Sequence, residues 1–220
     1  PRSTLFPSTT LFRSTSYHRD GAGGGHGQPA GVSHPGLPRR VVDAALEGGE
    51  GAGKSTQARL LAEALRARGF EVITTREPGG TPGAEAIRSL LLNGVEGDTA
   101  GWGARAEALL FAAARADHVA RLIRPALERG AWVVCDRYLD SSRAYQGGGG
   151  GVSDADLLTL HAFGSEGLLP DLTLLVEVAA EEVVRRLALR DTEGSDRIGG
   201  REQAYHDRVA ATFRTLADAD

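Results

Sequence analysis

The chain has 220 residues, of which 41% are hydrophobic and 25% charged, as is usual for a soluble globular protein of one domain. Its formal net charge of −4 argues against a broad basic surface for nucleic acid, and no apolar run approaches the roughly 20 residues of a membrane span. A single cysteine, Cys135, excludes an internal disulfide framework and fits a reducing compartment, so we expect a cytoplasmic protein.

Residues 1–40 lack the pattern of a folded segment. They combine the glycine-rich run Gly21–Gly27 with several prolines, and their apolar residues recur with neither helical nor strand spacing. Such a segment cannot bury enough apolar surface to offset the entropy lost on ordering. We therefore predict that residues 1–40 are disordered or a non-native extension, and that residues 41–220 form the domain.

In residues 41–220, short apolar runs typical of strands alternate with longer runs that have helical spacing. The predicted strands are residues 41–46, 70–75, 131–135 and 172–178. The predicted helices are residues 55–68, 84–92, 104–129 (bent or broken at Pro125), 154–163, 180–190 and 203–216. This alternation predicts the α/β class, with three layers in which helices cover both faces of a parallel sheet.

Asp43 is out of place in the first predicted strand. A central parallel strand is buried on both faces, where an unpaired carboxylate costs several kcal/mol. One interpretation is that the native sequence begins only near Ala44.

A phosphate-binding motif follows this strand and opens the next helix. It matches G-x-x-x-x-G-K-[ST], and glycines at such a turn let backbone N–H groups surround a phosphate beside the positive end of the helix. The Lys54 ammonium can follow charge between phosphates, and the Ser55 hydroxyl can bind Mg²⁺. The residues predicted to bind ATP are Gly48, Gly49, Glu50, Gly51, Ala52, Gly53, Lys54, Ser55 and Thr56.

Lys54 is also the only lysine among 25 Lys and Arg residues. Either codon bias left one lysine by chance, or position 54 needs a compact ammonium that a guanidinium cannot replace. The motif itself could match by chance, since the chain has 30 glycines. Its place between a strand and a helix favours nucleotide binding.

Two further polar segments follow predicted strands. In an open parallel sheet, ligands bind beyond the carboxyl ends of the strands, where residues 76–80 (REPGG) and 136–138 (DRY) lie. Asp136 can hold Mg²⁺ through water, and Arg137 can bind a phosphate with two hydrogen bonds. With Ser55, Asp136 is the candidate metal site.

Phe111 and Arg115 are four residues apart on one predicted helix and so point the same way. An aromatic face beside a guanidinium suits a flat, hydrogen-bonding base. The alternative is a core phenylalanine and a surface arginine.

Arginines are concentrated near the end of the chain, at Arg185, Arg186, Arg190 and Arg197, around a break at residues 192–195. One interpretation is a solvated helix end. The other is a lid, at about residues 186–200, that closes and brings cations to the transferring phosphoryl group.

Together these segments resemble the bacterial thymidylate kinases, P-loop nucleoside monophosphate kinases that use ATP to phosphorylate dTMP to dTDP in dTTP biosynthesis. The resemblance runs from about Leu46 to the end of the chain. It rests on seven segments in order: LEGGEGAGKSTQ (46–57), TREPGGT (75–81), IRSLLL (87–92), ALLFAAARADHV (108–119), DRYLDSSRAYQG (136–147), LPDLTLLVEV (169–178) and DRI (196–198).

The resemblance implies roles for individual residues in binding dTMP. Glu50 would face the 3′-hydroxyl of the deoxyribose, Phe111 would stack on thymine, and Arg115 would contact the base. The remaining contacts would be Arg88 and Arg137 to the dTMP phosphate, Glu77 near the phosphates and metal, Ser142 and Gln146 to the nucleotide, and Tyr145 at the sugar pocket.

It also implies that catalysis is alignment and charge neutralisation between two polyanions. Lys54, Arg137, Arg190 and Mg²⁺ would supply the positive charge. Some relatives carry an arginine in the loop where this chain has Gly51, so here we expect the arginine to come from the lid. Arg190 is the expected lid arginine, with Arg186 and Arg197 in support.

Three departures from the family pattern lead to further expectations. The glycine run 147–151 is expected to form a loose loop, and Gly199-Gly200 is expected to weaken lid docking because the family has an acidic residue there. The family continues past Asp220 with a strand and a helix. We therefore expect a C-terminally truncated domain with four strands, residues 172–178 at a sheet edge, an open adenine pocket and weak activity.

Two other functions stay open on the residues alone: a P-loop kinase for a different small molecule, and a non-catalytic nucleotide-binding fragment. A homodimer through helix 104–129 is possible. His118 and His206 are predicted to be helix-surface or packing residues.

Overall fold

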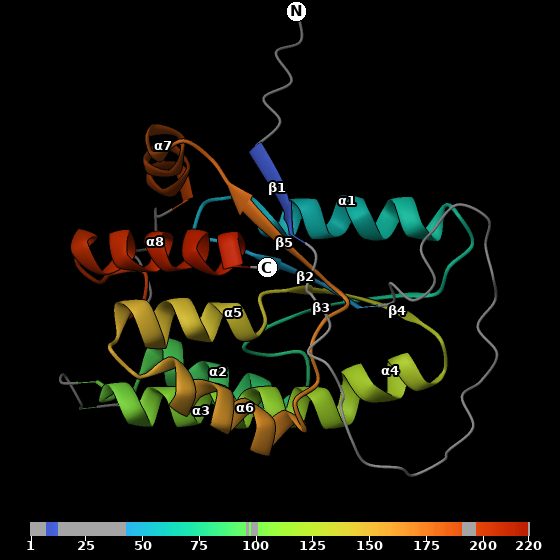
Figure 1. Ribbon diagram of the computed structural model, residues 1–220, viewed down its shortest axis with the longest axis horizontal. Helices are drawn as coiled ribbons and strands as arrows, with labels where there is room; N and C mark the ends of the chain where they lie inside the picture. Colours follow the sequence, from blue (N-terminus) through green and yellow to red (C-terminus); the bar gives the residue numbers. More distant parts are fainter. Residues whose placement is uncertain (1–7, 13–42, 96, 98–100, 191–196, 220) are drawn as a thin grey trace, which may run out of the picture.

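The computed structural model describes residues 8–12, 43–95, 97, 101–190 and 197–219, and for residues 8–12, 180 and 187–190 it describes the backbone only. Its sheet has the strand order β1-β5-β2-β4-β3. Four strands pair in parallel with one another, which confirms the predicted α/β class (Figure 1). They are β2 (Asp43–Glu47), β3 (Val72–Arg76), β4 (Trp132–Asp136) and β5 (Leu172–Glu177).

The fifth strand, β1 (Ser8–Phe12), comes from the segment for which no structure was predicted. It pairs antiparallel with β5, from Ser8 opposite Glu177 to Phe12 opposite Thr173. The four expected parallel strands are present, but the expectation that residues 172–178 lie at a sheet edge is wrong, because β1 adds a fifth strand beside β5. An unpaired strand edge presents a row of free N–H and C=O groups, which an extended segment can satisfy whatever its side chains. Residues 1–7 and 13–42 lie outside the described residues.

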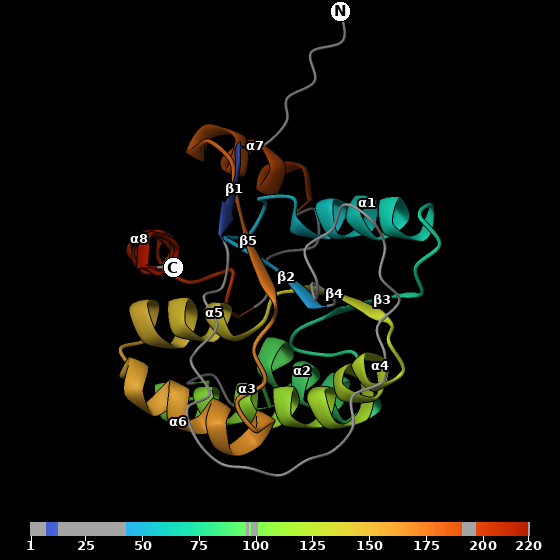
Figure 2. The same ribbon diagram turned by 45° about the vertical axis from the view of Figure 1, so that its right-hand side comes forward.

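Helices cover both faces of the sheet (Figures 1 and 2). On one face lies α1 (Lys54–Arg66), and on the other lie α3 (Ala104–His118) and α4 (Arg124–Glu128). The α2 helix (Pro82–Asn93) and the α6 helix (Asp154–Ser165) pack against α3. Two last helices, α7 (Ala180–Arg190) and α8 (Gln203–Ala219), follow β5. All six predicted helices are present.

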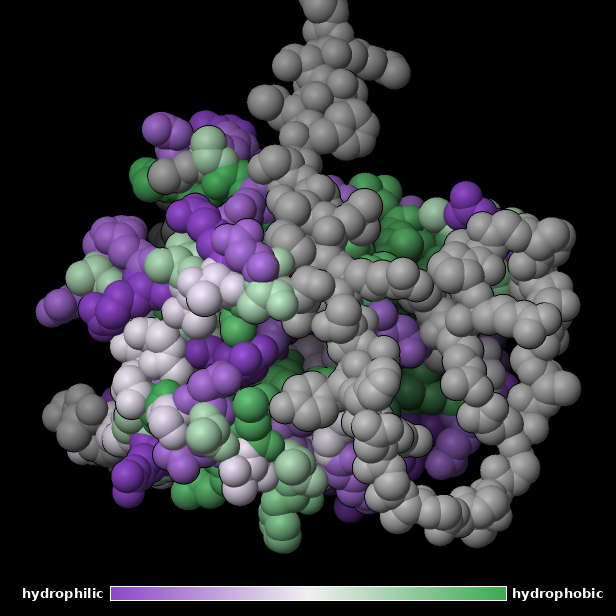
Figure 3. Space-filling model, viewed as in Figure 1, coloured by the Kyte–Doolittle hydropathy of each residue, from purple (hydrophilic) through white to green (hydrophobic). Residues whose placement is uncertain are grey.

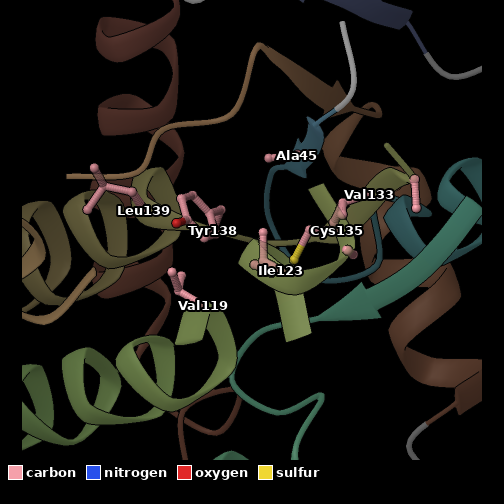
Figure 4. Packing of buried hydrophobic residues seen from close by; sticks show 9 residues of the cluster. Ala45, Val119, Ile123, Val133, Cys135, Tyr138 and Leu139 are labelled. Carbon is pink, nitrogen blue, oxygen red and sulfur yellow. The ribbon is translucent and has the colours of Figure 1, made fainter. Parts of the chain in front are cut away.

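The side chains of β4 show how the two layers are held. Val133 and Cys135 pack with Val119 and Ile123, which come from the helical segment after α3 (Figure 4). Trp132 and Val134 point the other way, into a cluster with apolar residues of α1. This alternation follows from the two-residue period of a strand, and it fixes the sheet between its helical layers.

The surface agrees with this layered core. In Figure 3, hydrophilic side chains dominate over α8, whereas hydrophilic and hydrophobic ones lie side by side over α7. None of the helices in the described part of the chain combines the length and the apolar character needed to span a bilayer.

The predicted helix 104–129 is interrupted before Pro125. A π-helical segment, η1 (Val119–Ile123), separates α3 from α4, and Pro125 lies in the first turn of α4. Proline has no N–H to donate and its ring clashes with the preceding turn, so the helix widens at this point and then continues.

Asp43 is the first residue of β2 and is 4% exposed. Its backbone N–H donates to the Asp171 carboxylate at 3.1 Å. Burial, with smaller contributions from the negative charges of Asp171 and Glu77, raises the pKa of the Asp43 carboxyl to about 7. Burying the Asp43 carboxylate is thus unfavourable, as predicted, and the carboxyl group keeps its proton until near neutral pH.

The sequence patterns did not predict α5 (Leu139–Ser142) or the π-helical segment η2 (Arg143–Gly149). Gly148 and Gly149 of this region pack tightly on α8, so the expectation of a loose loop is wrong there. A Cβ atom on Gly148 would lie 1.9 Å from the Thr212 hydroxyl, and one on Gly149 would lie 2.4 Å from the Tyr205 ring. These glycines let η2 and α8 approach closely.

His161 on α6 is buried, and neither ring nitrogen makes a hydrogen bond of normal geometry to the described residues, although the backbone of Leu168 lies near enough to oppose the lowering of its pKa. Its ring meets Tyr138 edge-on, with the centres 5.8 Å apart. Burial, and then the charge of Arg115, lower the pKa of His161 to about 4. The folded protein therefore holds this ring neutral.

We expect His161→Leu to raise the free energy of unfolding by about 1 kcal/mol at pH 7.5, because it removes two unsatisfied buried nitrogens. The gain should be larger at pH 5. Below the ordinary histidine pKa of 6.5 the unfolded chain binds a proton that the folded chain rejects, so the parent loses stability as pH falls toward 4. Urea unfolding at both pH values measures the difference. Phe163→Leu, at an 89% exposed position of the same helix, is the pH-independent control. A less stable His161→Leu variant at pH 7.5 would contradict the assignment.

Candidate functional site

A cavity of about 700 Å³ opens at the carboxyl ends of the parallel strands. Residues of the β2–α1 loop, the segment after β3, α3, the segment after β4, and η2 line it together. The predicted site residues in its lining are Glu50, Gly51, Ala52, Gly53, Lys54, Ser55, Thr56, Glu77, Arg88, Phe111, Arg115, Asp136, Arg137, Ser142, Tyr145 and Gln146. Gly48 and Gly49 belong to the same loop but are not part of the lining.

Close packing fixes the backbone of the β2–α1 loop. Gly48 has φ 135°, and a Cβ atom there would lie 2.3 Å from the Val176 carbonyl oxygen of β5. Gly53, with φ 96°, precedes the first residue of α1. No other residue type adopts these angles readily, so the loop needs glycine at both positions. The N–H groups at the start of α1 are thereby held at the cavity.

Lys54 is the first residue of α1, and its side chain folds back over the loop. Its Nζ atom donates to the Gly49 carbonyl at 2.7 Å, and the residue is 6% exposed. Burial, and then the charge of Arg137, lower the pKa of the Lys54 ammonium to about 7, although nearby carboxylates oppose this. A bound polyphosphate would supply the missing counter-charge.

Ser55 and Asp136 are in contact in the lining of the cavity, although they lie 81 residues apart in the chain. The Ser55 hydroxyl donates to the Asp136 carboxylate at 2.5 Å. A hydroxyl and a carboxylate oxygen are hard donors of the kind that Mg²⁺ prefers, and Mg²⁺ sites of this type are completed by phosphates and water. The two side chains therefore fit the predicted metal site.

Arg137 follows β4 in the left-handed backbone region, with φ 73°. Its guanidinium donates to the Gly48 carbonyl at 2.9 Å and to the Tyr145 hydroxyl at 3.2 Å, and it lies 4.9 Å from the centre of the Tyr145 ring. A non-glycine residue with positive φ is uncommon and is held in place by its surroundings. These contacts hold the arginine against the phosphate-binding loop.

A buried ion pair joins Glu77 to Arg115. The Arg115 Nε donates to Glu77 at 2.7 Å, and both side chains are 4% exposed. The other guanidinium bonds of Arg115 go to the Tyr138 carbonyl at 3.0 Å and to the Ser142 hydroxyl at 2.9 Å. Both oxygens of Glu77 are engaged, because His118 contacts the second one at 3.1 Å. In this structure Glu77 thus orients Arg115.

His118, which the sequence patterns predicted to be a helix-surface or packing residue, is fully buried and belongs to this network. One ring nitrogen contacts Glu77, and the other contacts the Thr75 hydroxyl at 2.7 Å. The sequence signal was its spacing, since His118 lies three residues after Arg115, on the same face of the helix.

Glu47, the last residue of β2, is a second buried carboxylate that the sequence analysis missed. It accepts from the Tyr138 N–H at 2.8 Å and from the Ser141 hydroxyl at 2.6 Å. Burial, and then the charge of Asp140, raise its pKa to about 7. Glu47 thereby holds the segment that carries Arg137.

The described part of the lid brings Arg186 to the cavity. Its Nη1 atom donates to the carbonyls of Gly51 and Ala52 at 3.2 and 3.3 Å, and its Nε donates to Glu182 at 2.6 Å. The backbone of Arg190 lies in α7, but its side chain is outside the described residues. Arg197 is not part of the cavity lining, and its guanidinium lies against Gly94 and Gly101.

The end of the lid approaches the phosphate-binding loop. A Cβ atom on Gly199 would lie 2.9 Å from a carboxylate oxygen of Glu50. The neighbouring Ile198 lines the cavity. The expectation that Gly199-Gly200 weakens lid docking stays a prediction.

Comparison with known proteins gives a consistent result. The model of the thymidylate kinase family matches residues 46–220. The thymidylate kinase of Rhizorhabdus wittichii is 61% identical over 181 residues, which are 82% of this chain and 85% of that protein. The thymidylate kinase of Gluconobacter oxydans is 53% identical over 178 residues, 80% of each chain. The crystal structure of thymidylate kinase from Ehrlichia chaffeensis has a TM-score of 0.62 and 31% identity, and covers 80% of each chain.

Proposed function

The chain belongs to the thymidylate kinase family and is a nucleoside monophosphate kinase that phosphorylates dTMP in nucleotide biosynthesis; from this premise we propose that its cavity seats ATP and dTMP with their phosphates facing each other. One observation carries the proposal. Lys54, Arg137 and Phe111, from three separate parts of the chain, line the same 700 Å³ cavity.

At the phosphate end, the start of α1 and Lys54 hold the ATP phosphates, and Arg88 and Arg137 hold the phosphate of dTMP. An oxygen of the dTMP phosphate attacks the γ-phosphorus, the bond from that phosphorus to the β–γ bridging oxygen breaks, and ADP leaves with the electron pair. The attacking oxygen is already anionic at neutral pH, so no strong base is needed. The side chains act by aligning the two phosphates and neutralising their charge.

Ser55 and Asp136 would hold Mg²⁺ beside the ATP phosphates. When bound, the ion supplies electrostatic stabilisation of phosphate oxygens. The hydrogen bond between the two side chains supports this assignment, because it keeps both oxygen donors on the same side of the loop before the ion arrives.

The lid supplies a further guanidinium, that of Arg186, which contacts the phosphate-binding loop. Since Arg186 donates to the Gly51 and Ala52 carbonyls, it reaches the phosphate-binding loop, where the β- and γ-phosphates would bind. We propose Arg186 as a catalytic cation together with Arg190, the arginine expected from the resemblance.

At the base end, Phe111 provides the stacking face, while Arg115, Ser142 and Gln146 provide polar groups. We expect Phe111→Ala to raise KM for dTMP about 10- to 100-fold, since stacking of a base on an aromatic ring contributes about 1–3 kcal/mol. KM for ATP should stay within twofold. Steady-state kinetics with each substrate varied in turn gives both constants, and Leu109→Ala, 56% exposed on the same helix, is the matched control. An unchanged KM for dTMP would remove Phe111 from the pocket.

Release of ADP from ATP and Mg²⁺ with a panel of nucleoside monophosphates tests the function directly. Preferential turnover of dTMP is expected. Preference for another monophosphate would favour a different P-loop kinase, and binding without turnover would favour a nucleotide-binding fragment. The homodimer and the cytoplasmic location stay predictions. Sedimentation and cell fractionation test them.

A further inference from the structure

A chain of buried polar groups lies behind the base end of the cavity and ends on α8. Gln146, on η2, donates from its Nε2 atom to Glu107 of α3 at 2.9 Å. The other oxygen of Glu107 accepts from Arg201, which precedes α8 and lies 94 residues away in the sequence. Neither Glu107 nor Arg201 was a predicted site residue, and the cavity lining includes only Gln146.

Burial makes the contact between Gln146 and Glu107 directional. Gln146 is 1% exposed, and the Glu107 side chain is 6% exposed. An ionised carboxylate only accepts hydrogen bonds, so the amide must turn its NH₂ group toward Glu107. The amide oxygen then points away from Glu107, and among the described residues it accepts no hydrogen bond. Gln146 therefore presents an acceptor on the side away from Glu107.

Arg201 forms an ion pair with Glu107 and ties it to the wall of the pocket. Its Nη1 atom donates to the Tyr205 hydroxyl at 2.7 Å, and its guanidinium lies 4.6 Å from the centre of that ring. The Tyr205 hydroxyl in turn donates to the carbonyl of Tyr145 at 3.0 Å, one residue before Gln146. The Gln146 amide and the backbone that carries it are thus both held in place by Arg201 and Tyr205, at the start of α8.

We propose that Glu107 and Arg201 are positioning residues for base recognition: their ion pair orients the Gln146 amide so that its oxygen faces the pyrimidine. The N3–H of thymine donates to such an oxygen. Cytosine has an acceptor at N3, which would face another acceptor and lose a hydrogen bond. This inference rests on the proposed function, because it assumes that the base lies between Phe111 and η2.

The variant Glu107→Gln tests the orientation with little change in shape. A neutral amide can donate or accept, so the Gln146 amide is free to turn its NH₂ group toward the base. We expect the ratio of kcat/KM for dTMP to that for dCMP to fall about tenfold, mainly through KM for dTMP, with kcat for dTMP within threefold of the parent. Glu63→Gln, in an exposed ion pair on α1, is the matched control.

Arg201 gives an independent test from the other end of the pair. Arg201→Gln should lower the same ratio, and Arg201→Lys should restore most of it, since an ammonium can also form an ion pair with the Glu107 carboxylate. Arg214→Gln, an exposed ion-pair residue of α8, should leave the ratio unchanged. Equal losses for dTMP and dCMP would make the pair merely structural and overturn the proposal, as would an unchanged ratio. If the parent itself fails to turn over dTMP, the proposed function fails instead.

Discussion

Replacing Lys54 by alanine is expected to lower kcat about 10³-fold or more, while KM for dTMP changes less than threefold. The Lys54 ammonium lies at the start of α1 over the phosphate-binding loop, 2.7 Å from the Gly49 carbonyl. From this position its long stem lets the charge follow the phosphoryl group between the two nucleotides. The base end of the cavity, at Phe111 and Gln146, keeps its own contacts and should bind dTMP as before.

Two variants make the Lys54 experiment specific. Lys54→Arg keeps the charge but introduces a planar group into a position that is 6% exposed, so it should recover little of the lost kcat. Arg59→Ala, in an exposed ion pair on the same helix, should leave kcat within twofold. ADP release under saturating substrates measures kcat. A loss of dTMP affinity as large as the loss of kcat would contradict the assignment of Lys54 to the ATP phosphates.

The second large effect is expected on stability. Arg115→Met should lower the free energy of unfolding by about 3–5 kcal/mol, because it leaves the Glu77 carboxylate buried without its guanidinium partner. The side chains of this pair are 4% exposed, so water cannot replace the lost contact. The Tyr138 carbonyl and the Ser142 hydroxyl lose a donor as well. Urea unfolding monitored by far-UV circular dichroism measures the change.

A double variant separates the buried charge from simple loss of packing. Arg115→Met with Glu77→Gln should be more stable than Arg115→Met alone, since the second change removes the unpaired charge. Arg129→Met, which breaks an exposed ion pair with Glu71, should change stability by less than about 1 kcal/mol. If Arg115→Met and Arg129→Met cost the same, the buried pair does not hold the site together.

The sequence was most informative where chemistry is local. The phosphate-binding loop was predicted from eight consecutive residues, because the glycine angles and the helix start that make it are encoded at neighbouring positions. The alternation of strands and helices likewise follows from short-range periodicity, and all six predicted helices and the four parallel strands are present. The resemblance to thymidylate kinases assigned most of the cavity lining before the fold was known.

Local patterns were least informative about η2. A run of glycines has no side chains whose polarity would predict burial. That η2 is packed follows only from its contacts with the Thr212 and Tyr205 side chains of α8. The same holds for β1, since any extended segment can pair with the free edge of β5 through its backbone.

The sequence by itself therefore determined the fold class, the phosphate-binding loop and the family to which this chain belongs. Only the tertiary structure shows which groups orient the side chains of the site. Glu77 and His118 lie behind Arg115, and Glu107 and Arg201 lie behind Gln146. The physical reason is that a hydrogen bond between residues 94 positions apart leaves no periodic trace in the chain. Its strength depends on burial, which exists only once the helices and the sheet have packed.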